Sequence, residues 1–332
     1  METDASTVSA AQRAAFEEQG FLAVDELLDD ADLAPLEAEY AALLDRVAAQ
    51  LVASGEIAHG HEGLPFNRRF CAVLADCPDL HRHFNISLPL INGPVDPDTC
   101  HMHAGPAVFH VLRNEKILDL VEQFIGPEIY ASPVQQMRMK PPEKQLSGEN
   151  AQHSNVGATT WHQDIVALLP EADDTHQLTV WVAVTEATQE NGCLVSVPGS
   201  HREGAKVHCS NLALASEPQV PGRLMEGREV VPLPVKRGGV VLFHKMNVHR
   251  ALPNRSDQLR WSMDLRYHPT GQASGRPAFP GFVARSRSDP ASELHDAGAW
   301  AGRWETARRA IVGGQFRGRV FEDTRWNDPA VC

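Results

Sequence analysis

Apolar residues recur at two different periods along this chain. Between residues 10 and 53 they return every three or four positions, which predicts a short helix, a strand and then a long amphipathic helix that packs against a sheet. Residues 55–105, rich in Gly, Pro, Asn and His, predict loops with short helical pieces, and residues 107–125 return to helical spacing. The apolar face of the long helix would consist of Leu33, Leu36, Tyr40, Leu44 and Val47.

Beyond residue 128 short apolar runs between turn residues predict strands. Many short strands at this spacing are typical of a sandwich or jelly roll, whose open end can hold a metal ion. The polar residues 148–155 precede one predicted strand and are placed to form a lid, and helical spacing returns after residue 281. We therefore expect a mainly β fold with flanking helices. The predicted strands cover residues 130–140, 160–168, 178–184, 193–197, 230–234, 239–243 and 259–267.

Length and charge limit the organisation and the partners. With 332 residues, 42% of them hydrophobic, the chain can bury a large core, and we expect one domain: a helical and loop part (1–127), a jelly-roll core (128–270) and a helical tail (271–332). The formal net charge of −13 argues against nucleic acid or anionic membranes as partners. Without an 18-residue apolar run or an apolar leader, we expect a cytoplasmic protein. The oligomeric state is left open.

The six cysteines are scattered without a C-x-x-C pair. This pattern indicates neither a zinc ribbon nor a dense disulfide framework, so we expect reduced thiols. The residues concerned are Cys71, Cys77, Cys100, Cys193, Cys209 and Cys332.

Two histidines and one carboxylate are candidates for a metal centre. His162 and Asp164 are two positions apart, so on a strand both side chains would point to one face, and His249 would supply a third ligand from a distant strand. This ligand set selects non-haem Fe(II). Arg260 offers a guanidinium fork for the carboxylate of an organic co-substrate.

A short His/Asp pair alone more often forms surface hydrogen bonds than a metal site. Here the apolar run 165–169 follows Asp164, and another apolar run, 238–243, leads to His249. An unpaired carboxylate in such a buried segment would be costly and needs a cation or donors. The surroundings therefore favour a metal.

Several blocks of sequence resemble the phytanoyl-CoA dioxygenase family of Fe(II)/2-oxoglutarate enzymes. They are the opening at Phe16 to Phe21, the segment Lys140-Pro141-Pro142, the motif Trp161-His162-Gln163-Asp164, the stretch from Asn191 to His201, and the stretch from Phe243 to Arg260, in which Arg260 follows His249 by eleven positions. The resemblance covers roughly residues 10–270. It implies a double-stranded β-helix, cupin-like core and the cofactors Fe(II), 2-oxoglutarate and O2.

The resemblance also implies roles for individual residues. His162, Asp164 and His249 would hold iron, and Arg260 would bind the distal carboxylate of 2-oxoglutarate. Trp181, Gln163 and Gln136 occupy family positions close to the co-substrate. One departure matters: Ala251 stands where the family often has a small hydroxyl residue two positions after the distal histidine, so a hydrogen bond to 2-oxoglutarate is missing or comes from another residue.

Other polar residues are candidates for the substrate pocket. Gln136 and Arg138 alternate with two methionines, so either pair could face the cavity. His101 and His103 form one of three H-x-H pairs, for which surface or capping roles are the ordinary interpretation, but their loop could cover a pocket. His201 could line the cavity mouth.

The predicted activity is that of a 2-oxoglutarate-dependent dioxygenase, in the simplest case a hydroxylase. It would oxidise an unactivated C–H bond of a small organic molecule and release succinate and CO2. The alanine-rich, arginine-preferring composition is typical of high-GC bacteria and makes a natural-product intermediate one candidate substrate. The alternatives are a zinc-type hydrolase, which has no role for Arg260, and a non-catalytic small-molecule-binding protein of the same fold.

Overall fold

Two antiparallel sheets face one another in this computed structural model, which describes residues 7–90, 95–146, 148, 151, 153–210, 218–316 and 325–332. In the described part, seven strands form the larger sheet in the order β1-β7-β4-β9-β2-β10, with β3 also paired to β9, and three form the smaller sheet in the order β6-β5-β8. Apolar side chains from both sheets, among them Trp181, Phe243 and Leu194, pack together between them. This is the expected mainly β, jelly-roll core. The strands are β1 (Phe21–Val24), β2 (Glu128–Ala131), β3 (Gln136–Lys140), β4 (Leu178–Ala183), β5 (Leu194–Ser196), β6 (Val231–Leu233), β7 (Val240–His244), β8 (His249–Ala251), β9 (Arg260–Pro269) and β10 (Phe282–Ser286).

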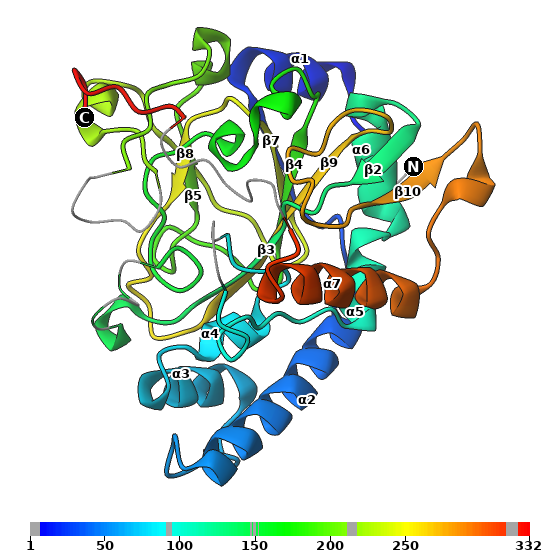
Figure 1. Cartoon of the computed structure of the whole chain (residues 1–332). Coiled ribbons are helices and arrows are strands. Elements are labelled where there is room, and N and C mark those ends of the chain that lie inside the picture. The colour runs from blue at the N-terminus through cyan, green and yellow to red at the C-terminus, as the bar shows by residue number, and fades with distance from the viewer. Residues whose placement is uncertain are drawn as a thin grey trace.

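Helices from both ends of the chain cover the outer face of the larger sheet (Figure 1). The long helix α2 begins at an Asp29 capping box. The Asp29 side chain accepts a hydrogen bond from the backbone N–H of Asp32, and the Asp32 side chain accepts one from the backbone N–H of Asp29. Trp300 and Trp304 of α7 are buried in the same core, so the helix predicted in the tail is confirmed. The α-helices are α1 (Ala10–Gln19), α2 (Asp30–Ser54), α3 (Phe66–Asp76), α4 (Leu80–Phe84), α5 (Pro106–Leu112), α6 (Glu115–Ile125) and α7 (Ala297–Val312).

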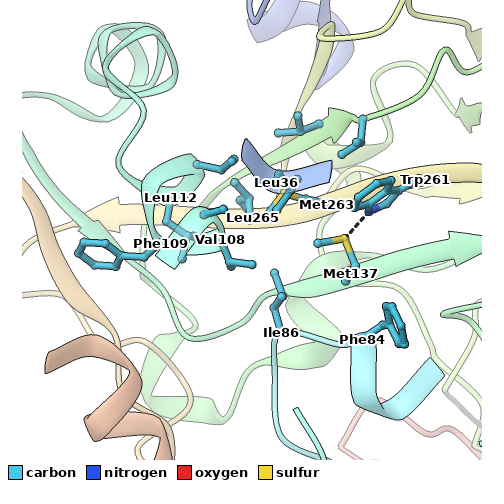
Figure 2. Packing of buried hydrophobic residues seen from close by; sticks show 14 of the residues in the cluster. Leu36, Phe84, Ile86, Val108, Phe109, Leu112, Met137, Trp261, Met263 and Leu265 are labelled. Carbon is cyan, nitrogen blue, oxygen red and sulfur yellow. Dashed lines mark hydrogen bonds between the residues drawn. The ribbon is translucent and has the colours of Figure 1, made fainter. Parts of the chain in front are cut away.

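Strand β9 separates the apolar core from the polar interior of the jelly roll. Met263 and Leu265 point toward the helices, and the Trp261 indole N–H lies 2.7 Å from the Met137 sulfur (Figure 2). The alternate residues of β9 project to the other face, because side chains on a strand alternate. These are Arg260, Ser262, Asp264 and Arg266, all buried.

One predicted strand is wrong. Residues 160–168 contribute a single bridge, between His162 and His249, followed by a 3-10 helix over Asp164–Ala167. A short buried apolar run fits a strand and a tight helical turn equally well, so periodicity could not separate them. The predicted strand 130–140 is divided in two, and the tail contains a strand, β10, besides its helix.

Cys209 and Cys332 form a disulfide, so the expectation of reduced thiols is wrong for this pair. The two residues are 123 positions apart, and only the folded chain brings them together. None of the described helices is long and apolar enough to cross a membrane. The cytoplasmic location stays a prediction, as does the lid over residues 148–155, part of which lies outside the described residues.

Candidate metal centre

His162, Asp164 and His249 converge at one end of the jelly roll. Each offers one ligand atom, and these atoms lie within 4.8 Å of one another. The two histidines face each other because their backbones exchange both hydrogen bonds of an antiparallel bridge, each at 3.0 Å. The start of the 3-10 helix then places Asp164 beside them. The two segments are far apart in sequence, so the fold assembles the triad.

Both imidazoles are oriented for metal binding through Nε2. His162 Nδ1 lies 2.8 Å from the Thr160 carbonyl oxygen, and His249 Nδ1 lies 3.0 Å from that of Asn247. A carbonyl oxygen only accepts, so each Nδ1 carries a proton and Nε2 is the ring nitrogen that can bind a metal. Burial, reinforced by His249, lowers the pKa of His162 to about 3, which keeps this imidazole neutral.

The Asp164 carboxylate is held by two donors. Thr179 Oγ1 donates to Oδ2 at 2.5 Å, and Arg266 Nη2 donates to Oδ1 at 2.5 Å. Burial by itself would raise the pKa of Asp164, but the Arg266 guanidinium holds it well below the ordinary value. Each carboxylate oxygen still has a lone pair for a cation. The donor set of two imidazoles and one carboxylate fits Fe(II).

An inner cavity extends from the two histidines of the triad toward Arg260. The Arg260 side chain is fully buried and lies over the Trp181 ring at 5.3 Å. Its Nη1 donates to Ser262 Oγ at 2.6 Å, whereas Nε and Nη2 have no partner among the described residues. Burial lowers the pKa of Arg260 to about 10, so the guanidinium is charged at neutral pH. Buried donors without acceptors are costly, and a carboxylate between the two would satisfy both.

Lys140 lies directly opposite Arg260 in the pairing of β3 with β9, and both line the inner cavity. Two cationic side chains at one cavity suit an anionic ligand. The residues present therefore fit 2-oxoglutarate as well as iron.

A larger outer chamber opens on the other side of the triad, with a volume of about 360 Å³. This volume is within the usual range for small-molecule sites. His162, Thr159, Arg138 and Arg266 line both spaces, so the metal centre lies where they meet. The described lining of the outer chamber also includes Asp164, His81, Arg82, His101, Gln136, His153, Arg276 and Phe279.

Residues 16–262 match the family model for phytanoyl-CoA dioxygenase (PhyH). The chain belongs to this family. The match spans the triad, Trp181 and Arg260, and confirms the resemblance found in the sequence.

Curated relatives match a shorter stretch. Phytanoyl-CoA dioxygenase domain-containing protein 1 from Danio rerio is 39% identical over 111 residues, which is 31% of this chain and 37% of that protein. Dioxygenase lolE1 from Epichloe uncinata is 34% identical over 89 residues, 27% of this chain and 32% of that protein. The matched stretch thus spans about a third of these relatives.

Solved structures support the fold over a greater length. The non-heme monooxygenase ThoJ has a TM-score of 0.56 at 19% identity, covering 91% of this chain and 98% of that one. The carbocyclase SnoK from nogalamycin biosynthesis has a TM-score of 0.50 at 18% identity, covering 89% and 96%. At these identities the likeness concerns the fold.

Of the remaining residues predicted for this PhyH-family site, four lie at the cavities: Trp181, Gln136, Arg138 and His101. Trp181 lines the inner cavity, where it supports Arg260. Gln136 lines the outer chamber, and its methionine neighbours Met137 and Met139 face the core. Arg138 lines both spaces and is held by Asp264 at 2.8 Å.

Gln163 makes contacts of another kind. Its side-chain nitrogen donates to the carbonyl oxygens of Gly204 and Met246, and its side-chain oxygen accepts from the backbone N–H of Lys206. Gln163 is not among the described residues that line the two cavities. Its amide holds the loops around the metal motif.

The histidines proposed for the substrate pocket are dispersed. His101 lines the outer chamber, stacked on His83. His103 binds Glu39 at 2.7 Å on the helical side of the molecule, and His201 lies 3.1 Å from the Glu17 carbonyl oxygen, beside α1. His103 and His201 are thus absent from the described lining of the outer chamber.

Sequence reasoning missed Thr159, Thr179, Asp264 and Arg266. Asp264 and Arg266 follow Arg260 at even spacing on β9, so their common face could have been inferred from alternation. Neither threonine has a comparable signal in the sequence.

Proposed function

We propose that this protein is an Fe(II)- and 2-oxoglutarate-dependent dioxygenase that oxidises, and in the simplest case hydroxylates, an unactivated C–H bond of a small organic molecule. The observation that carries the proposal is the inner cavity that joins His162 and His249 of the triad to the two unpartnered donors of buried Arg260. When bound, iron and 2-oxoglutarate together supply the activation of O2, with succinate and CO2 as co-products.

The protein's own residues would bind the metal and orient the co-substrate. His162 and His249 present Nε2 to the metal because their Nδ1 protons are engaged by backbone carbonyls. Asp164 stays ionised beside Arg266. Arg260 binds the far carboxylate of 2-oxoglutarate and so fixes the direction of the co-substrate toward the triad.

The outer chamber would hold the substrate against the metal centre. Its apolar lining, which includes Leu88, Val134 and Phe279, excludes water from the reacting C–H bond. A zinc-type hydrolase would use the same triad but gives the buried Arg260 no task, and a non-catalytic binding protein would need neither the complete ligand set nor the buried arginine. Both alternatives therefore explain the site less well than the oxygenase does.

The first experiment is an anaerobic titration of the metal-free protein with Fe(II) and then 2-oxoglutarate, followed by visible absorption. Chelation of a 2-oxo acid by iron gives a weak metal-to-ligand charge-transfer band, which we expect in the wild type and not in His249→Ala. Binding of iron without this band would overturn the proposal in favour of the hydrolase or the binding protein. If the band forms, candidate substrates are screened by stoichiometric succinate release, and analysis of the oxidised product identifies the reaction.

A further inference from the structure

Thr159 places a hydroxyl group with an uncommitted proton in the inner cavity. Its Oγ1 accepts the backbone N–H of Ala251 at 2.5 Å, and its own proton has no acceptor among the described residues. The other hydroxyl of the cavity lining, on Thr179, already donates to Asp164. Thr159 is therefore the hydroxyl donor that this cavity still has available.

The position of this hydroxyl is set by strand β8. Ala251 follows His249 by two residues, so both side chains point to the same face and Ala251 lies about 7 Å further along the strand. Ala251, Thr159 and Arg260 all line the inner cavity. The hydroxyl is thus anchored at the level of Ala251, beyond the metal ligand.

We propose that Thr159 donates a hydrogen bond to the 2-oxoglutarate carboxylate that Arg260 binds, and so supplies the hydroxyl that β8 lacks at Ala251. This inference rests on the proposed function. It assigns Thr159, three residues before the metal ligand His162, to co-substrate binding.

The need for a further donor follows from the chemistry of a buried carboxylate. Arg260 has Nε and Nη2 to offer, which form a planar fork for two of the roughly four lone-pair positions of a carboxylate. In a cavity walled in part by Leu194, Phe243 and Ala251, the remaining positions need donors to offset the cost of removing the charge from water.

The bond from Ala251 prepares the Thr159 hydroxyl for this role. This hydrogen bond fixes the position of Thr159 Oγ1 and occupies one of its lone pairs on the side of β8. The hydroxyl proton therefore points away from the Ala251 N–H, toward other acceptors. An accepted hydrogen bond also polarises the hydroxyl and strengthens the bond that it donates. Thr160 cannot replace it, because Thr160 is not among the described residues that line the inner cavity.

The test compares two co-substrates that differ only at the far end. 2-Oxoglutarate has a distal carboxylate, whereas 2-oxopentanoate has the same carbon chain with a methyl group there and chelates iron through the same 2-oxo acid unit. Dissociation constants for both are measured anaerobically on the Fe(II)-loaded protein from the visible charge-transfer band. Their ratio isolates the distal carboxylate from chelation.

We expect Thr159→Val to raise the Kd for 2-oxoglutarate by about ten- to a hundredfold, the usual effect of losing a hydrogen bond to a charged group. The Kd for 2-oxopentanoate should stay close to that of the wild type. Thr159→Ser, which keeps the hydroxyl, should bind both like the wild type.

A second variant guards against a merely structural effect, because Thr159→Val also removes the acceptor of the Ala251 N–H. Ala251→Ser, introduced into Thr159→Val, puts a hydroxyl on β8 at the same level of the cavity and should recover part of the lost affinity for 2-oxoglutarate. Thermal unfolding of each variant shows whether the fold is kept.

Two results would overturn the role of Thr159 and leave the proposed function intact. They are unchanged 2-oxoglutarate binding in Thr159→Val, or an equal loss of affinity for both 2-oxo acids. A wild type that binds Fe(II) but shows no band with 2-oxoglutarate would instead overturn the proposed function, and this inference with it.

Discussion

Arg266 donates to the Asp164 carboxylate at 2.5 Å, so the acidic ligand of the triad is held by a cation that itself lines both cavities. The pair is buried, with Arg266 at 4% and Asp164 at 1% exposure. Removing one partner of such a pair leaves the other charge uncompensated. The orientation of the metal ligand thus depends on a residue of β9 that would not touch the metal.

Replacement of Arg266 should weaken iron binding. We expect Arg266→Met to lower the affinity for Fe(II) by about ten- to a hundredfold, the usual effect of losing the partner of a metal ligand. Calorimetric titration with Fe(II) under anaerobic conditions measures it. Arg266→Lys keeps the charge but not the planar fork, and should fall between wild type and Arg266→Met. Equal affinities in all three would show that Thr179 alone orients Asp164.

Arg260 should matter for the co-substrate and not for the metal. In Arg260→Ala we expect the KM for 2-oxoglutarate to rise by a factor of about 30 or more, because a buried charge-assisted bond is lost, whereas Fe(II) affinity stays unchanged. Arg287→Ala, an exposed arginine of the β10 end, is the matched control. If Arg260→Ala loses iron as severely as His162→Ala does, the assignment of Arg260 to 2-oxoglutarate is wrong.

Gln163 should affect stability and not co-substrate selection. Gln163→Ala removes three hydrogen bonds to the backbone, and we expect the free energy of unfolding to fall by about 2–3 kcal/mol. Chemical denaturation measures this loss. The ratio of the affinities for 2-oxoglutarate and 2-oxopentanoate should remain that of the wild type. A selective loss of 2-oxoglutarate binding would restore the role predicted from the sequence.

Stability at acid pH should depend on Glu39. Burial raises the pKa of Glu39, but hydrogen bonds from His103 and from the backbone N–H of Ala107 lower it below its ordinary value of 4.5. Because the folded-state pKa is depressed, this stabilisation is complete above about pH 4.5 and is lost as the pH falls through the lower folded-state value. Glu39→Gln should be less stable than the wild type at neutral pH, with a smaller difference near pH 3. Glu17→Gln, an equal charge change on exposed α1, should show no such convergence.

The disulfide should contribute to stability by restricting the unfolded chain. Cys209 and Cys332 close a loop of 123 positions, and we expect Cys332→Ser to lower the free energy of unfolding by about 2–4 kcal/mol. Urea unfolding with and without a reductant measures this. The reductant should destabilise the wild type and leave Cys332→Ser unchanged; sensitivity of both proteins would point to another thiol.

The local features of the molecule could be predicted from the sequence. Helical periodicity located α2 and α7, and an apolar run after turn residues located β9, because these patterns depend on residues a few positions apart. The sequence also pointed to His162, Asp164 and His249, whose ligand atoms the fold brings together, whereas the role of Arg260 stays a prediction. The assignment of residues 160–168 to a strand failed where a short apolar run was compatible with two structures.

The tertiary structure decided which distant residues meet. Thr159 with Ala251, Asp164 with Arg266, and Cys209 with Cys332 are pairs that no local pattern joins, since each depends on how two segments cross. The same holds for His103, whose ring turns to Glu39 of α2 and not to the outer chamber. Spacing along the chain determines the direction of a side chain within its own element, whereas its partner depends on which other element the packing places opposite.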